Sequence, residues 1–389
     1  MHPKNKIAIG TRWIGPGEST FIIAEAGSNH NGDVELGKRL IEAAKAAGAD
    51  AIKFQKFFTE ELVLPDAPKA RYQIATTGSK ENQFQMLKHL ELGKSEFQIL
   101  VTHAQKTGIL FFASVFDHPS VDFMMGLGTP AIKIGSGDTN NLPLIQKAAK
   151  TGLPILLSTG MSILEEIDAA IACIEQTGNE QVLLFHCVSS YPTPYSSTNL
   201  RIMETLRKRY PYPIGYSDHT LGITAPLAAV ALGAVSIEKH FTLDKKLAGP
   251  DHSMSIDPDE LKTLVSEIRN VEQTLGHSEK EVLEVERDIL SVARKSLVAK
   301  ITIPQGTTIT EEMISIRRPA SGISPACLKQ VLGKKAPSTI PAGQMLPKSL
   351  LLGAEMLRTP SPSPVLRTPS PSRGEGGGEG DPMSRGEQY

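Results

Sequence analysis

The sequence is poor in cysteine, in long apolar runs and in excess charge of either sign. Its three cysteines, Cys173, Cys187 and Cys327, lie too far apart for a disulfide framework or a cysteine-based metal cluster, so we expect a reduced, cytoplasmic setting. No stretch approaches the roughly 20 apolar residues of a membrane span, and the N-terminus lacks the apolar segment of a signal peptide. Lys plus Arg number 41 and Asp plus Glu number 42, so the overall charge indicates no nucleic-acid partner and no membrane partner.

Eight short apolar runs between residues 21 and 241 have the character of buried parallel strands. They cover residues 21–27, 51–57, 109–115, 131–137, 154–160, 182–189, 213–218 and 235–241. Segments with helical spacing lie between them, for example 34–50, 141–152, 163–178 and 221–234. This alternation predicts an α/β fold, a (β/α)8 TIM barrel, and leaves a doubly wound open sheet as the alternative.

The composition changes after the barrel pattern ends. We expect a barrel domain over 1–280, closed by a helix at 261–276, and then a linker over 281–292. Residues 293–352 hold short β-type runs and two Pro-x-Gly turns, IPQG and IPAG, which predict a small, mostly β domain. Residues 353–389 are rich in Pro, Ser and Gly and have too few apolar residues for a core, so we expect a disordered tail.

Polar side chains recur where the predicted strands end, and barrel enzymes take their reactive groups from those ends. The residues in question are Glu25, Lys53, Gln55, Ser114, Lys133, Ser136, Ser158, Ser189, Tyr191, Ser217, His219 and His240. Because side chains alternate along a strand, Lys53 with Gln55, and Glu238 with His240, share a face. The loop GSNHNG at 27–32 could cradle a phosphate, although a turn that needs positive φ explains its glycines equally well.

His219 and His240 close two neighbouring strands, and neutral imidazoles are common ligands of divalent metals. Two protein ligands would leave coordination positions for substrate oxygens and water. The alternative is that each histidine only bonds a backbone carbonyl. The adjacent pair His186 and Cys187 looks reactive by composition, but neighbouring strand residues face opposite ways, so we expect packing there.

Lys53 and Lys133, together with the nearby serine hydroxyls, are typical of a pocket for phosphate or carboxylate. One lysine could instead form a Schiff base with a keto substrate, or merely pair with Glu25. Glu25 itself could bind sugar hydroxyls, act as an acid or base, or form a structural salt bridge.

Several motifs taken together resemble the sialic acid synthase family. They are IAEAGSNHNG, GADAIKFQ, KIGSGDTNNLPLI, LLSTGMS, HCVSSYPTPY, GYSDHTLG, ALGAVSIEKHFTLD, GPDHSMS and RRPASGISP, and the resemblance runs from about residue 5 to 352. It implies a barrel followed by an antifreeze-like (SAF) domain. It also implies a transferase that condenses phosphoenolpyruvate with an N-acetylated amino sugar to a nine-carbon 2-keto acid and phosphate. The implied cofactor is a divalent metal, Mn2+ with Mg2+ or Co2+ as substitutes, and the implied assembly is a domain-swapped homodimer.

The same resemblance assigns roles to individual residues. Metal ligation falls to His219 and His240, and the catalytic group also includes Glu25, Lys53 and Lys133. Phosphoenolpyruvate would be bound by Lys53, Ser114, Lys133, Ser136, Ser158 and Ser217. The amino sugar would be held by Glu25, Gln55, Ser189, Tyr191, Asp251 and, from the partner subunit's small domain, Arg318.

The sequence departs from many relatives at FASVF, at Asp138 and at Ser189, which bears on the choice of sugar. Residues 68–92 resemble the N,N'-diacetyllegionaminate and N-acetylneuraminate branches more than the pseudaminate branch. Of the two acceptors we favour 2,4-diacetamido-2,4,6-trideoxymannose, with N-acetylmannosamine next. A Schiff-base aldolase that uses Lys133 and a non-catalytic carbohydrate-binding protein are the rival functions.

Overall fold

The computed structural model describes residues 5–351, and its first unit is a closed eight-stranded parallel barrel. Its strands are β3 (Phe21–Gly27), β4 (Ala51–Lys56), β5 (Leu110–Val115), β6 (Ile132–Ile134), β7 (Ile155–Ser158), β8 (Val182–Cys187), β9 (Ile214–Asp218) and β10 (Ser236–His240). Strand β10 pairs with β9 on one side and with β3 on the other. This closure confirms the TIM barrel and excludes the open sheet. The run expected at 131–137 is a strand only to Ile134, because Ser136–Asp138 turns into a 3-10 helix.

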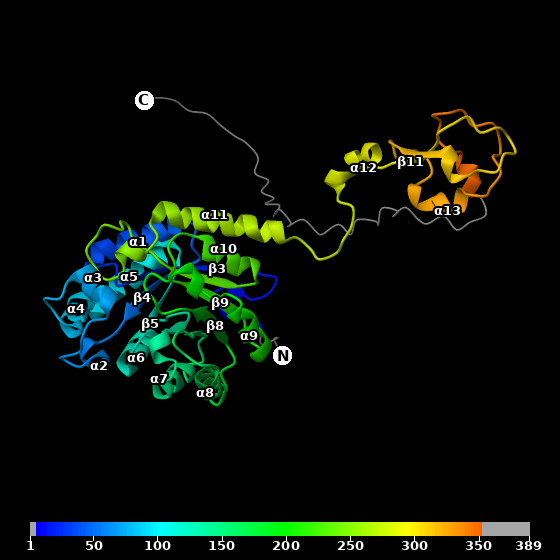
Figure 1. Ribbon diagram of the computed structural model, residues 1–389. Coiled ribbons are helices and arrows are strands. Elements are labelled where there is room, and N and C mark those ends of the chain that lie inside the picture. The colour runs from blue at the N-terminus through cyan, green and yellow to red at the C-terminus, as the bar shows by residue number, and fades with distance from the viewer. Residues whose placement is uncertain (1–4, 352–389) are drawn as a thin grey trace, which may run out of the picture. The chain divides into compact units, whose positions relative to one another are not determined.

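Eight helices, the last before each new strand and the one after β10, surround the barrel (Figure 1). They are α1 (Val34–Ala46), α5 (Lys94–Thr107), α6 (His118–Gly126), α7 (Leu142–Ala149), α8 (Leu164–Glu175), α9 (Ile202–Arg209), α10 (Thr224–Ala231) and α11 (Pro258–Leu275). Side-chain caps begin several of them: Asp33, Asp117, Asn141 and Asp257 each accept a backbone N–H of the first turn. Within residues 5–351, no helix is long and apolar enough to cross a membrane.

The strand side chains sort by alternation into an outer and an inner set. Outward residues such as Ile52, Phe54 and Ile237 join the main apolar core under the helices. Inward residues near the strand starts form a second apolar cluster with the hairpin β1 (Ile7–Ile9) and β2 (Arg12–Ile14), which closes that end of the barrel. The inward charged residues therefore lie toward the C-terminal ends of the strands, whereas Ser236, at the start of β10, donates to the Phe21 carbonyl at 2.8 Å.

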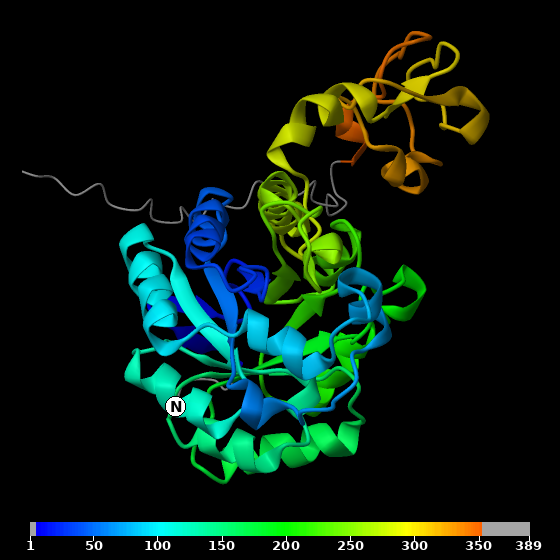
Figure 2. The same ribbon diagram turned by 90° about the vertical axis from the view of Figure 1, so that its left-hand side faces the viewer.

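An insertion of short helices separates β4 from α5 and lies in front of the strands in Figure 2. It contains α2 (Thr59–Leu62), α3 (Arg71–Thr77) and α4 (Gln83–Leu90). Its two ends are joined because Lys56 Nζ donates to the carbonyl of Leu92 at 2.9 Å. The sequence pattern predicts no element here, since these helices are too short to show a clear period.

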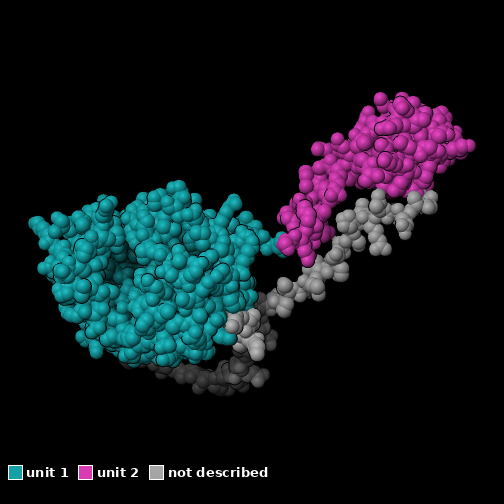
Figure 3. Space-filling model, turned by 60° about the horizontal axis from the view of Figure 1, so that its bottom comes forward, with its two compact units in different colours: residues 1–277 teal, residues 278–389 magenta. Residues whose placement is uncertain are grey.

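The second unit begins at Ser278 and has its own apolar core (Figure 3). Strands β11 (Ser296–Ala299) and β12 (Ile314–Arg317) pair antiparallel, and the short helix α13 (Leu328–Val331) packs into the same core. This small domain agrees with the expected fold class. The segment expected as a linker holds a 3-10 turn at Glu284–Glu286 and helix α12 (Arg287–Ala293). The tail expected over 353–389 lies outside the described residues.

Candidate active site

His219 and His240 lie side by side at the C-terminal end of the barrel. His240 ends β10, His219 directly follows β9, and their ring centroids are 5.4 Å apart. His219 Nδ1 lies 2.7 Å from the carbonyl oxygen of Val188, so Nδ1–H donates and Nε2 keeps its lone pair. Burial lowers the pKa of both imidazoles, and for His240 the neighbouring His219 lowers it further. Both rings are neutral at neutral pH, as metal ligands must be.

The two histidines fit a metal site that leaves coordination positions for substrate and water. They do not fit a site in which the protein supplies all the ligands. Among residues 5–351, no group of three or more His, Cys, Asp or Glu side chains is placed to hold a metal ion. His240 Nδ1 is buried without a hydrogen-bond partner, and the nearest carboxylate, Asp251 Oδ2, is 3.9 Å away. A divalent ion at the two imidazoles would take its other ligands from substrate and water, which is typical of catalytic sites.

Two lysines and two glutamates are buried inside the same end of the barrel; we call Glu25, Lys53, Lys133 and Glu238 the inner cluster. Lys53 Nζ is 2.7 Å from Glu25 Oε2, and Lys133 Nζ is 3.0 and 3.1 Å from the two Glu238 oxygens. The side chains of all four are at most 6% exposed. The four side chains meet because each lies on the inward face of its strand.

The two carboxylates of the inner cluster differ in charge. Burial raises the pKa of Glu25 to about 7, because the nearby Lys53 offsets the cost of desolvation only in part. Burial acts in the same direction on Glu238, but Lys133 and Lys53 outweigh it and lower its pKa to about 2. Glu25 therefore exchanges a proton near neutral pH, whereas Glu238 is a permanent counter-ion. Burial also lowers the pKa of Lys133.

Serine hydroxyls surround the lysines. Ser114 Oγ accepts a hydrogen bond from Lys53 Nζ at 2.7 Å, and Ser217 Oγ donates to Glu238 at 3.1 Å. Ser158 Oγ and Ser189 Oγ are buried without partners among the described residues. An unsatisfied buried hydroxyl costs free energy, so these two are groups that a bound ligand could satisfy.

Gly160 lies in close contact with several polar groups of the site. Its N–H donates to Ser136 Oγ at 3.0 Å, and Ser136 Oγ lies 3.0 Å from Cys187 Sγ. A Cβ built on Gly160 would meet Ser189 Oγ at 2.5 Å, Ser136 Oγ at 2.8 Å and Cys187 Sγ at 2.9 Å. The position therefore has no space for a side chain, and glycine lets these polar groups pack directly against the backbone.

The residues that the resemblance assigns to an amino sugar line the same end, apart from Arg318. Gln55 Nε2 donates to Glu25 Oε1 at 3.4 Å, and burial raises the pKa of Asp251 to about 6. The Tyr191 ring packs against His219, with centroids 4.4 Å apart. Arg318 belongs to the second unit, where it is exposed just after β12.

Three residues of the site are absent from the sequence-predicted set. Glu238 could have been included, because it shares a strand face with His240 two residues later. Cys187 points inward while His186 points outward to the Thr198 carbonyl, so the two form no reactive pair, as expected. Cys187 nonetheless lies beside Ser136, and burial raises the pKa of the Cys187 thiol. Tyr72, from the insertion, packs against Tyr191 with ring centroids 5.0 Å apart, and no local pattern indicates this contact.

The loop GSNHNG is a turn that holds the next loop in place. Gly27 and Gly32 have φ of 52° and 74°, as the turn interpretation requires. Asn29 Nδ2 donates to the Phe241 carbonyl and to Ser255 Oγ, both at 2.9 Å. Asn31 Nδ2 donates to the Ala248 carbonyl at 2.8 Å. The loop therefore fixes the segment that carries Asp251.

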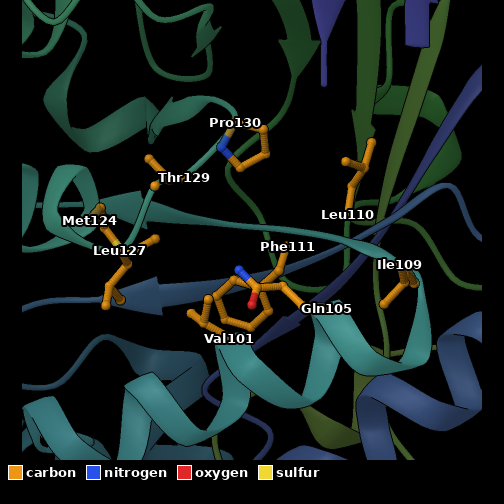
Figure 4. A pocket seen from close by; sticks show the side chains of 10 residues that line it. Val101, Gln105, Ile109, Leu110, Phe111, Met124, Leu127, Thr129 and Pro130 are labelled. Carbon is orange, nitrogen blue, oxygen red and sulfur yellow. The ribbon is translucent and has the colours of Figure 1, made fainter. Parts of the chain in front are cut away.

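A separate surface cavity of about 200 Å³ lies beside the start of β5, and none of the site residues lines it (Figure 4). Its lining is mostly apolar and comes from α5, the end of α6 and the start of β5: Val101, Gln105, Ile109, Leu110, Phe111, Met124, Leu127, Gly128, Thr129 and Pro130. It contains no titratable side chain. The polar end of the barrel is therefore the candidate active site.

Comparisons with known proteins identify the family. Residues 40–280 match the NeuB family and residues 294–352 match the SAF domain. The N,N'-diacetyllegionaminic acid synthase of Legionella pneumophila is 42% identical over 88% of this chain and 97% of its own length. That of Campylobacter jejuni is 44% identical over 82% and 96%. The crystal structure of an N-acetylneuraminic acid synthetase from Leptospira borgpetersenii, in complex with citrate, has a TM-score of 0.65 at 39% identity and covers 73% of this chain and 95% of that one. The chain therefore belongs to the NeuB family, a family of transferases with sialic acid and legionaminic acid synthases among its named members.

Proposed function

We propose that this protein condenses phosphoenolpyruvate with an N-acetylated amino sugar, giving a nine-carbon 2-keto acid and inorganic phosphate. The observation that carries the proposal is the meeting, at one barrel end, of two neutral imidazoles with the buried inner cluster. When Glu25 holds a proton, the inner cluster has one net positive charge, because it contains two ammonium groups, Lys53 and Lys133, and one ionised carboxylate, Glu238. A niche of that charge with unsatisfied hydroxyls suits a small anion that carries phosphate and carboxylate.

Lys53 and Lys133 would bind the anion together with the hydroxyls of Ser114, Ser136, Ser158 and Ser217. Ser158 Oγ supports this role most directly, because it is buried and lacks a partner. The Ser136 hydroxyl could rotate away from the N–H of Gly160 and leave this N–H as a donor for a phosphate oxygen, without a change in the backbone. The lysines would exchange part of their pairing with the glutamates for the charge of the substrate.

In the reaction, C3 of phosphoenolpyruvate forms a bond to the aldehyde carbon of the open-chain sugar. The aldehyde oxygen takes up a proton, water adds at C2, and phosphate leaves as the ketone forms. A divalent ion at His219 and His240, Mn2+ in the first instance, would polarise the aldehyde oxygen. Glu25 can supply or hold the proton on the sugar side, since its pKa is about 7 and Gln55 orients it.

For the acceptor we propose 2,4-diacetamido-2,4,6-trideoxymannose, held by Glu25, Gln55, Ser189, Tyr191 and Asp251. The likeness to two N,N'-diacetyllegionaminic acid synthases supports this choice over N-acetylmannosamine. The short Ser189 side chain offers a small hydroxyl to a deoxygenated sugar, and the contacting rings of Tyr72 and Tyr191 offer an apolar wall. The low cysteine content supports a cytoplasmic setting for the reaction.

We also propose a homodimer in which Arg318 of each small domain completes the other subunit's site. Its exposure at the end of β12 leaves its guanidinium available for a substrate. Arg318→Ala should raise the KM for the amino sugar without loss of folding. Mixed dimers with an inactive barrel variant should regain activity if the residue acts across subunits, and they should stay inactive if it acts within its own chain.

The test of the reaction measures phosphate release from phosphoenolpyruvate by metal-free protein, with and without Mn2+, with the two sugars in parallel. We expect metal-dependent release, faster with the diacetamido sugar. Release without metal would remove the proposed role of the metal. No release with either sugar, combined with borohydride trapping of a keto acid on Lys133, would favour the Schiff-base aldolase instead. No release and no trapping would leave the carbohydrate-binding alternative.

A further inference from the structure

A second buried ionic group lies on the outer side of the barrel wall, beside the two histidines. It consists of Tyr216, Asp218, Thr220 and Lys239, and we call it the outer cluster. Asp218 and Lys239 are 1% and 2% exposed, and Tyr216 belongs to the main apolar core. These side chains point away from the inner cluster because they alternate along β9 and β10 with the inward residues Ser217 and Glu238.

The outer cluster is fully paired, in contrast with the inner one. Lys239 Nζ forms an ion pair with Asp218 and donates to the Thr220 carbonyl at 2.8 Å. The Asp218 carboxylate also accepts from Tyr216 OH at 3.0 Å, from Thr220 N at 2.9 Å and from Thr220 Oγ1 at 3.0 Å. No oxygen of this carboxylate is left for a ligand, so the cluster is not itself a binding site.

The residues of the outer cluster lie on both sides of His219 in the chain and directly before His240. Asp218 and Lys239 are register partners on β9 and β10, and they directly precede His219 and His240. Thr220, on the other side of His219, is bonded to both. The His219 carbonyl in turn accepts from Thr193 N at 2.8 Å. The outer cluster therefore holds both chain neighbours of His219. It also holds Lys239, the residue before His240.

Stability alone does not account for such an arrangement. Replacing a buried ion pair by apolar residues of similar volume is often neutral or stabilising, because desolvation offsets the attraction of the charges. An apolar pair forms no directional bonds, so it would not fix the end of β9 relative to the end of β10. The effect of the cluster is therefore positional.

We propose that the outer cluster sets the spacing and orientation of His219 and His240 for a divalent cation, with Asp218 and Lys239 as positioning residues. The proposal rests on the metal role given to the histidines under the proposed function. It requires that metal affinity depends on residues that touch neither metal nor substrate. Groups behind metal ligands commonly change affinity by about 10- to 100-fold.

The test measures the Kd for Mn2+ of the metal-free full-length chain without substrates, by the electron paramagnetic resonance signal of free Mn2+. The double variant Asp218→Leu/Lys239→Met removes both charges together and keeps the volume, so it should stay folded. Its Kd should rise about 10- to 100-fold. Thr220→Val, which removes one hydroxyl and keeps the backbone bonds, should raise the Kd by a smaller factor.

Asn179→Ala is the matched control. Asn179 is buried and donates to the Ala149 and Leu153 carbonyls at 3.1 and 2.9 Å, before β8 and away from the histidines. It should lower the Tm and leave the Kd for Mn2+ unchanged, which separates a positional effect from general loosening.

An unchanged Kd in the folded double variant overturns the proposal. Should that variant fail to fold, an unchanged Kd in Thr220→Val overturns it, and so does an equal rise in Asn179→Ala. A wild-type chain that binds no Mn2+ overturns the metal role as well, whereas normal wild-type binding with unaffected variants overturns the positioning role alone.

Discussion

The two ends of the barrel interior bury very different groups. At the strand starts, Ile9 and Ile14 of the N-terminal hairpin pack against Phe112, Leu156 and Phe185, and all are at most 2% exposed. At the strand ends the interior instead holds two lysines, two glutamates and hydroxyls without partners.

This difference separates stabilisation from function within one fold. Apolar burial stabilises by about 25 cal/mol per Å², so the strand starts need no other explanation. Buried charges and unsatisfied hydroxyls cost free energy, about 1–3 kcal/mol for each hydroxyl left without a partner. The polar end is explained only if a ligand recovers part of that cost.

The strongest test of the polar end removes one histidine. His240→Ala should lower Mn2+-dependent phosphate release by roughly 10³-fold or more, because Lewis-acid stabilisation is worth several kcal/mol. The Tm should stay close to wild type, since His240 Nδ1 has no partner to lose. Release assays and thermal unfolding followed by circular dichroism measure the two quantities. Unchanged turnover would remove the proposed metal site.

Removal of one inner lysine comes next. Lys53→Met should lower turnover by about 10²- to 10³-fold through lost charge stabilisation. Its effect on the free energy of unfolding should be small, because Glu25 can take up a proton in place of its ion pair. Lys56→Met, on the same strand but facing outward to Leu92, is the matched control. It should affect stability more than turnover, and the reverse order would contradict the assignment.

The close packing at Gly160 allows a purely steric test. Gly160→Ala should raise the KM for phosphoenolpyruvate by about 10-fold, or ~1.4 kcal/mol, because its Cβ would meet Ser189 Oγ at 2.5 Å. Gly137→Ala, where a Cβ would meet nothing within 4 Å, should leave the KM unchanged. Equal KM values for the two variants would place the anion elsewhere.

The pH dependence of substrate binding tests the charge of the inner cluster. Glu25, with a pKa of about 7, is protonated below that pH and ionised above it. The cluster therefore loses its net positive charge as pH rises, and the KM for phosphoenolpyruvate should rise about fivefold from pH 6 to pH 8, which corresponds to ~1 kcal/mol. Glu25→Gln should remove this part of the pH profile. A profile that is the same in both proteins would show that Glu25 is not the titrating group.

The smallest effect on activity is expected at the apolar end. Ile9→Ala should lower the free energy of unfolding by about 2–4 kcal/mol through the cavity it leaves. KM and kcat should remain at wild-type values below the Tm, because Ile9 lies at the opposite end of the strands from the histidines. Denaturant unfolding and steady-state kinetics measure both, and a selective loss of turnover would show that the two ends are not separable.

Much of the site could be predicted because strand patterns are local. The eight apolar runs coincide with the eight strands within a few residues, and the polar residues at their ends do meet. Alternation correctly placed Lys53 with Gln55 and Glu238 with His240 on inward faces. It also separated His186 from Cys187. Metal binding and the sugar preference stay predictions.

Other features depend on contacts between distant segments. The short helices of the insertion have no clear period, so the contact of Tyr72 with Tyr191 was not predictable. The closure of the strand starts by the N-terminal hairpin is likewise a long-range contact, and it has no signature in the hairpin itself.

The sequence by itself determined the barrel, the small second domain and the ring of polar strand ends, because alternation and turn residues act over a few positions. The tertiary structure decided how the charges are used. Glu25 and Glu238 are the same residue type on adjacent strands, yet one holds a proton near neutral pH and the other does not. The reason is that a pKa depends on burial and on the distances to Lys53 and Lys133, which only the folded chain sets.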